Sequence, residues 1–215
     1  MQLTGRSSSH FTRVVRIVAH ELGVPVTLVP VFDLTQVDAD CYGDNPTLKI
    51  PMLRESVDGE PLFGTMNICR RLAEHAAERS GKASNIIWPE TLTTHLSRNA
   101  SELVWHAMAA QVQLVFGTGI GKLDADNIFF LKGKRGFEGS LAWLESHLES
   151  VLEELPPDRL TSLCEVALFC VLDHIQWRET LPLEAYPRLR VFAQEFATRE
   201  SARATAYQFD VPPAS

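Results

Sequence analysis

The sequence predicts two domains of different fold classes, an α/β domain followed by an all-α domain that forms a helical bundle. The chain has 215 residues, which is enough for two domains that each bury a core. Strand-like and helix-like apolar patterns alternate over the first 80 residues, whereas only helical spacing is found after residue 91. This change of pattern separates the two predicted domains.

The first domain begins with a predicted strand, helix and strand. Leu3 is expected in the first strand, and apolar residues at helical spacing predict a helix over residues 10–22, which Gly23 ends. Residues 26–32 are a short β-branched run that predicts a buried strand.

The rest of this domain is predicted to hold a short helix at residues 34–41, two strands and a last helix. The strands cover residues 50–53 and 61–63 with a turn between them, and Thr65 begins the helix. The order β-α-β-α-β-β-α indicates an α/β sheet.

The domain limits follow from a loss of periodicity over residues 81–90, which we predict to be a linker. The first domain then covers residues 1–80 and the helical domain residues 91–215. Apolar stripes predict helices at residues 91–116 and 141–155.

Two more helices are expected further along the helical domain. Ser162 and Glu165 have the spacing of a capping box, and residues 166–177 are apolar nearly all round, which predicts the buried central helix of the domain. The last helix is predicted to begin near Tyr186-Pro187.

Two local signals in the helical domain resemble phosphate sites, and we interpret both as surface loops. Residues 117–122 are rich in glycine, but they follow a helix and lack the P-loop spacing, so we expect a loop that ends the helix. Lys132, Lys134 and Arg135 form the only dense basic run, and we expect a solvated loop there.

The composition is that of an ordinary soluble globular protein, with 22% charged residues and a formal net charge of −7. The negative charge argues against a nucleic-acid partner. The N-terminal residues include no long apolar stretch, so we expect neither a signal peptide nor a membrane anchor. The four cysteines lack metal-binding spacing, which predicts free thiols in a reducing cytoplasm and no metal site.

Several segments, taken in order, resemble the glutathione S-transferase superfamily. Residues 5–17 resemble its first turn and helix, and residues 45–53 resemble the pattern Asn-Pro-x-Gly-Lys-Val-Pro-x-Leu. Residues 58–72 resemble Asp-Gly-x-x-Leu-x-Glu-Ser-x-x-Ile-x-x-Tyr-Leu. The matching segments of the helical half are Ser162 to Glu165, Tyr186-Pro187 and residues 199–205.

The resemblance implies a thioredoxin-like, glutathione-binding first domain, with glutathione as the co-substrate. It also implies a cytoplasmic homodimer that acts in detoxification.

Ser9 is the residue that the resemblance places beside the thiol of glutathione. A free thiol has a pKa of about 8.5, so the thiolate must be stabilised before it attacks an electrophile. A hydroxyl donor and the positive end of a helix both stabilise such an anion, and Ser9 directly precedes the predicted first helix. Ser7 is the alternative, and either serine would otherwise only cap the helix.

The same resemblance assigns five residues to glutathione binding: Lys49, Ile50, Pro51, Gly64 and Thr65. It implies a cis peptide bond at Ile50–Pro51, with a trans bond as the alternative, and backbone pairing of Ile50 with the tripeptide. The start of the helix at Thr65 would bind the γ-glutamyl carboxylate.

Three positions depart from the family pattern. Gly64 stands where the family has Glu or Gln, which grips the γ-glutamyl group. His10 replaces a proline and Leu48 replaces a glycine. These departures predict weaker glutathione binding or a different grip on it.

The electrophile is expected between the two domains, with Phe11 from the first and Trp105, His106 and Met108 from the second. The alternative is that the apolar residues belong to the core and that His106 is only hydrogen-bonded.

The leading hypothesis is an enzyme that conjugates glutathione to small hydrophobic electrophiles. One alternative is a non-catalytic module of the same fold that binds ligands or partner proteins, and the Gly64 departure supports it. Another is a glutathione-dependent isomerase or peroxidase.

Overall fold

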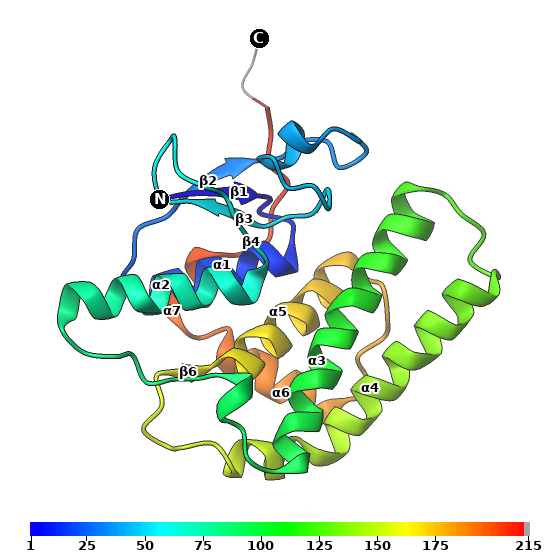
Figure 1. Ribbon diagram of the computed structural model, residues 1–215. Helices are drawn as coiled ribbons and strands as arrows, with labels where there is room; N and C mark the ends of the chain where they lie inside the picture. The colour runs from blue at the N-terminus through cyan, green and yellow to red at the C-terminus, as the bar shows by residue number, and fades with distance from the viewer. Residues whose placement is uncertain (213–215) are drawn as a thin grey trace. The chain divides into compact units, whose positions relative to one another are not determined.

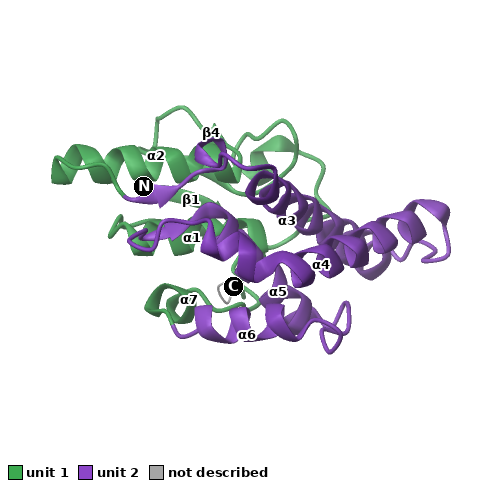
Figure 2. Cartoon of the chain, turned by 90° about the horizontal axis from the view of Figure 1, so that it is seen from below, with its two compact units in different colours: residues 1–84, 199–215 green, residues 85–198 purple. Residues whose placement is uncertain are grey.

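The computed structural model describes residues 1–212, which form two compact units (Figures 1 and 2). The first unit contains residues 1–84 and the described part of 199–215, and the second contains residues 85–198. The predicted limits of 1–80 and 91–215 stay a prediction, but in the structure the C-terminal segment groups with the first unit.

The first unit is built on a four-stranded mixed sheet in the order β2-β1-β3-β4. The strands are β1 (Gln2–Gly5), β2 (Thr27–Pro30), β3 (Met52–Arg54) and β4 (Leu62–Phe63). Strand β1 pairs with β2 in parallel and with β3 in the antiparallel sense, and β3 pairs antiparallel with β4. This is the predicted thioredoxin-like arrangement.

Helices α1 (His10–Glu21) and α2 (Thr65–Ser80) pack against one another on one side of the sheet, below it in Figure 1. Their inward faces are fully buried at Val14, Ile17, Ile68 and Leu72. The predicted element order is confirmed, with the short helix at 34–41 replaced by a 3-10 turn, η1 (Ala39–Tyr42). Helix α7 (Glu200–Ala204) packs on α1 and belongs to this unit.

The predicted burial of the second strand is wrong. Strand β2 lies at the edge of the sheet, and its residues alternate between exposed and half-buried. An edge strand has a neighbour on one side only, so a β-branched run does not by itself show a central position.

The second unit is predominantly helical, as predicted. Its elements are β5 (Ile86–Ile87), η2 (Pro89–Thr91), α3 (His95–Gln113), η3 (Leu114–Ile120), α4 (Ile128–Glu153), β6 (Thr161–Ser162), α5 (Leu163–Arg178) and α6 (Pro187–Phe196). Helix α5 is the predicted central helix, because twelve of its residues are buried. The capping box is confirmed, with Ser162 Oγ accepting from Glu165 N and Glu165 Oε2 accepting from Ser162 N, each at 3.0 Å.

The predicted basic loop is wrong, because its residues lie in a helix, and the predicted glycine-rich loop is wrong over residues 117–120, because the helix ends only at its C-cap, Gly121. The glycine-rich segment does not end the helix at 116, since a π-helical turn continues to Ile120, and the ring of Phe130 packs against Gly117. Lys132, Lys134 and Arg135 lie on α4, with their side chains exposed. Helix α4 tolerates its glycines because Phe130 and Phe137, two turns apart, are buried on one face.

The continuous helix His95–Ile120 is long and apolar enough to cross a membrane, with a mean hydropathy of 1.2 over 18 residues. Its buried side chains, among them Ala100, Val104, Ala107 and Met108, are part of the core of the helical unit. The core helix of a globular protein has the same length and composition.

Candidate functional site

The strand register brings three loops together at one end of the sheet. Thr4 of β1 lies opposite Met52 of β3, which lies opposite Phe63 of β4. Strands β1 and β4 end there and β3 begins there, so the loop after β1, the loop before β3 and the loop after β4 meet. These loops hold Ser7, Ser9, Lys49, Ile50, Pro51, Gly64 and Thr65, and we call this group the strand-end site.

Ser9 is the N-cap of α1, so the capping role left open by the sequence is confirmed. Its backbone is extended, and its Oγ accepts a hydrogen bond from the Thr12 N–H at 3.2 Å. A hydroxyl that accepts still has its own hydrogen to donate. The first turn of α1 consists of His10, Phe11, Thr12 and Arg13, none of them acidic, so it does not oppose an anion in front of the helix.

The three serines before α1 differ in exposure. Ser7 and Ser8 are only 2% and 6% exposed, whereas Ser9 is half-buried. The Ser9 N–H donates to the Arg6 carbonyl at 3.1 Å and closes a turn over residues 6–9. Ser9 is therefore the serine that a molecule in front of the helix can reach most easily.

Gly5 allows α1 to approach the end of β1 closely. A Cβ atom at this position would lie 2.6 Å from Oγ1 of Thr12, whose side chain is fully buried. The Arg6 N–H donates to the same Oγ1 at 3.4 Å. A larger residue at position 5 would therefore displace the turn that carries Ser9.

The loop before β3 is organised by Asn45, which is buried. Its Oδ1 accepts from the Thr47 N–H at 3.1 Å and from Thr47 Oγ1 at 2.9 Å, and its Nδ2 donates to the Lys49 carbonyl at 2.6 Å. The Lys49 side chain is exposed. The cis peptide bond predicted at Ile50–Pro51 is confirmed.

The loop after β4 leads directly into α2. Thr65 is the first residue of this helix, as predicted, and its Oγ1 donates to the Phe11 carbonyl at 3.5 Å. The N-cap is Gly64, with a φ of 88°. A Cβ there would meet only Nδ2 of Asn67, at 3.8 Å, so the positive φ rather than a lack of space favours glycine.

The four predicted electrophile residues are divided between the units. Phe11 is half-buried in the first unit, and Trp105 is half-buried in the second. His106 is exposed and lies 3.1 Å from Glu102, one helical turn away. Met108 has no exposed surface. A role for these residues in an electrophile pocket stays a prediction.

The second unit has an open surface depression of about 610 Å³, lined by α5, α6 and the segment between them. Its lining includes Asp173, Glu179, Glu184 and Arg190 but neither Trp105 nor the other predicted electrophile residues. We therefore assign no electrophile to it.

Sequence reasoning missed three residues around the strand-end site: Arg13, Asn45 and Asp210. Asn45 was detectable, because Asn before Pro is a turn signal. Arg13 was missed because an arginine is usually exposed to solvent, whereas the Arg13 side chain is only 3% exposed. Asp210 hydrogen-bonds to Ser7, 203 residues away, and no local pattern announces such a contact.

Comparison with known proteins points to one family. Residues 8–75 match the model of the glutathione S-transferase N-terminal domain. No curated protein matches the sequence.

Solved structures share the fold at low sequence identity. A glutathione S-transferase from Methylobacillus flagellatus with glutathione bound is 23% identical, with a TM-score of 0.72 over 96% of this chain and 99% of that one. A glutathione transferase family member from Pseudomonas fluorescens with bound glutathione is 19% identical, with a TM-score of 0.73 over 96% and 98%. Maleylacetoacetate isomerase from Methylobacterium extorquens, with malonate and glutathione, is 17% identical, with a TM-score of 0.69 over the full length of both.

Proposed function

We propose that this chain belongs to the glutathione S-transferase superfamily and that it is a glutathione-dependent enzyme, which adds the glutathione thiolate to small hydrophobic electrophiles. The observation that carries the proposal is the strand-end site. There a half-buried serine caps the N-terminus of α1, beside the start of α2 and the Ile50–Pro51 segment.

Each part of the strand-end site has a chemical role in this proposal. The Ser9 hydroxyl donates to the sulfur, and the N-terminus of α1 adds a positive potential. The backbone of Ile50 pairs with the backbone of the tripeptide. The first N–H groups of α2, at Thr65, bind the γ-glutamyl carboxylate, because a helix leaves these donors without intrahelical partners.

Ser9 is favoured over Ser7 as the thiol-activating residue. The Ser7 side chain is buried, whereas Ser9 is partly exposed and aligned with the helix. Gly64 contributes no side chain to the γ-glutamyl end, so recognition there relies on the helix terminus and on Lys49.

The proposal is tested by replacing Ser9 and measuring conjugation to chlorodinitrobenzene together with the pKa of the bound thiol. Without the hydroxyl, the pKa of the bound thiol rises by about one to two units, and kcat/KM near neutral pH falls by about 10- to 100-fold. Ser9→Ala also removes the helix cap. Ser9→Gly serves as the second variant, because glycine preserves an N-cap to within a few tenths of a kcal/mol.

Two controls separate catalysis from stability. Ser9→Thr keeps a hydroxyl and retains most of the activity, while Ser162→Ala removes a helix cap in the other unit and leaves the thiol pKa unchanged. Wild-type kcat/KM in both Ser9→Ala and Ser9→Gly would reject Ser9 as the activator and direct attention to Ser7. Failure of the folded wild type to bind glutathione in calorimetry would favour a non-catalytic module.

A glutathione-dependent isomerase is a second candidate, supported by the similarity to maleylacetoacetate isomerase. The same thiolate would add reversibly to an unsaturated acid and then leave after bond rotation. Isomerisation of such an acid at catalytic glutathione, without loss of free thiol, would identify this activity.

Other features of the proposal follow from the family. We expect a homodimer in the cytoplasm, with a small hydrophobic electrophile as the second substrate and a role in detoxification. Neither a membrane, a nucleic acid nor a metal is part of the proposed reaction.

A further inference from the structure

The turn that carries Ser9 is fastened by a residue from the other end of the chain. The Ser7 N–H donates to Oδ2 of Asp210 at 2.8 Å, across 203 residues of sequence. Ser7 is 2% exposed, so its N–H has no access to bulk water in place of this acceptor. The carboxylate therefore fixes the backbone two residues before the proposed thiol-activating hydroxyl.

The segment that leads to Asp210 is anchored on α1 by Arg13. The Arg13 guanidinium lies 4.1 Å from the ring centre of Tyr207, its Nη2 donates to the Ala202 carbonyl at 3.2 Å, and its Nε donates to Thr205 Oγ1 at 3.4 Å. Arg13 is 3% exposed, so these contacts replace the solvation of a buried cation.

A second cation, Arg16, lies one turn further along α1. Burial lowers the pKa of Arg16, the charge of Arg13 lowers it further, and the charge of Asp210 opposes both effects. The charge of Arg16 therefore favours the Asp210 carboxylate, in addition to the hydrogen bond that Asp210 accepts from the Ser7 N–H.

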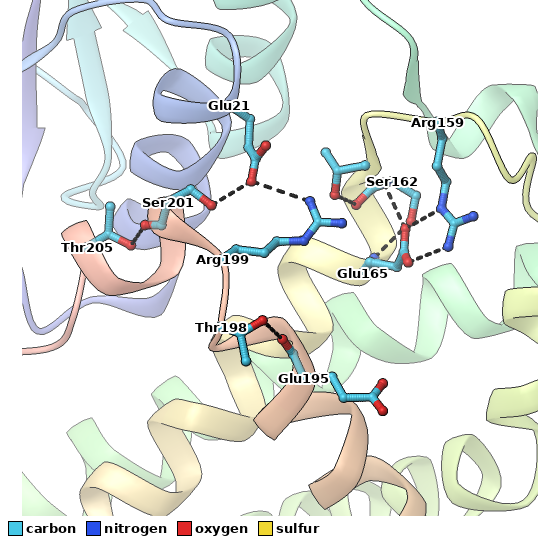
Figure 3. Close-up of polar contacts among 10 residues, drawn as sticks. Glu21, Arg159, Ser162, Glu165, Glu195, Thr198, Arg199, Ser201 and Thr205 are labelled. Atoms are coloured by element: carbon cyan, nitrogen blue, oxygen red, sulfur yellow. Dashed lines mark hydrogen bonds and ion pairs between the residues drawn. The ribbon is translucent and has the colours of Figure 1, made fainter.

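The same C-terminal segment is also fixed at its start. Glu21, the last residue of α1, accepts from Ser201 Oγ at 2.6 Å and lies 3.4 Å from Nη1 of Arg199 (Figure 3). Thr205 Oγ1 donates to the Ser201 carbonyl at 2.8 Å, and this hydrogen bond fixes the side chain of Thr205, which Arg13 also contacts. With contacts at Glu21, Arg13 and Ser7, the segment runs along α1 from its last turn to its first.

We propose that Asp210 is a positioning residue for the thiol chemistry, which holds the turn of residues 6–9 so that the Ser9 hydroxyl points at the glutathione sulfur. This inference rests on the proposed function of the strand-end site. Asp210 touches neither substrate nor sulfur in this role and acts through the backbone of Ser7. A small displacement of a positioned catalytic group is enough to slow a reaction strongly.

The test compares Asp210→Ala with Asp210→Asn. The control is Glu60→Ala, which removes an exposed carboxylate of the same unit that lies outside α1 and the C-terminal segment. The measurements are kcat and KM for glutathione with chlorodinitrobenzene, and the pKa of the bound thiol from thiolate absorbance. Asp210→Ala is expected to lower kcat by about tenfold and to raise the thiol pKa by about one unit, with little change in KM. Asp210→Asn keeps an acceptor for the Ser7 N–H, so its kcat is expected to fall by less than about threefold. Glu60→Ala is expected to have the kcat and the thiol pKa of the wild type.

A purely structural role predicts a different result. In that case Asp210→Ala unfolds at a lower temperature but keeps the wild-type kcat and thiol pKa, which overturns the inference. If Asp210→Ala does not fold, Asp210→Glu decides, because it moves the carboxylate by one methylene: a threefold or larger loss of kcat supports the inference, and a wild-type kcat overturns it. Failure of the proposed function appears instead in the wild type, which then neither binds nor conjugates glutathione and removes the basis of both proposals.

Discussion

At the scale of single residues, Leu48 shows how a departure from the family pattern is accommodated. Leu48 has a φ of 55°, in the left-handed region, at a position where the glutathione S-transferase pattern has glycine. This conformation costs a residue with a Cβ roughly 1–2 kcal/mol. We expect Leu48→Gly to be more stable than Leu48→Ala by about 1 kcal/mol, since both variants lose the leucine side chain and only alanine keeps the strain. Urea unfolding of the two variants at constant m measures the difference, and a more stable alanine variant would contradict it.

The sequence allowed most of the strand-end site to be proposed at this scale, because its residues lie in short motifs. The sequence next to each feature predicts it: the helix cap at Ser9, the helix start at Thr65 and the cis bond at Ile50–Pro51. Arg13 and Asp210 are not, because their partners lie about 190 and 203 residues away, and a sequence pattern carries no information about such pairing.

At the scale of elements, the N-terminus of α5 makes stability depend on pH. Burial by itself would raise the pKa of Glu165, but hydrogen bonds from Arg159 and Ser162 outweigh it, so the pKa is lowered. Figure 3 shows this carboxylate between the Arg159 guanidinium and Ser162, the helix cap. The Nη2 and Nε atoms of Arg159 donate to the two carboxylate oxygens at 2.6 and 2.7 Å. A carboxyl whose pKa is lowered by folding adds stability above its unfolded pKa of about 4.3, and this contribution is lost as the pH falls through the folded pKa.

We therefore expect Glu165→Gln to lower the free energy of unfolding by about 3 kcal/mol at pH 7, because it leaves the partly buried Arg159 without its counter-charge. The difference from wild type should shrink at acidic pH, where the wild-type carboxyl is protonated as well. Chemical unfolding of the variant and the wild type at several pH values measures the difference in their free energies of unfolding. Glu149→Gln is the matched control, because its partner Arg188 is exposed and the pair contributes at most about 1 kcal/mol. A pH-independent difference would show that the charge of Glu165 is not responsible.

The helices also show where prediction by element failed. Gly117, Gly133 and Gly136 indicate loops by local propensity, yet all three lie in helices. Packing of Phe130 against Gly117 and burial of Phe137 decide the conformation there, because tertiary burial outweighs about 1 kcal/mol of glycine propensity per residue.

At the scale of the whole molecule, the reactivity of the four cysteine thiols distinguishes the folded chain from the unfolded one. Cys41 is exposed, whereas Cys69, Cys164 and Cys170 are buried, and burial raises the pKa of Cys164 to about 12. We expect one thiol per folded chain to react with a disulfide reagent and all four to react after denaturation. Since desolvation and the nearby Asp40 and Asp38 raise the pKa of Cys41, its reaction should accelerate as the pH rises. Fast reaction of more than one thiol in the native protein would contradict the burial.

The hydrogen bond between Ser7 and Asp210 also sets the order in which this protein can mature on the ribosome. Synthesis at about 5–20 residues per second separates the two partners by roughly 10–40 s, since 203 residues lie between them. During that interval the nascent N-terminal turn lacks its acceptor, and the whole of residues 85–198 is synthesised before Asp210. The backbone turn before Ser9 can therefore take the conformation described here only after Asp210 has been synthesised.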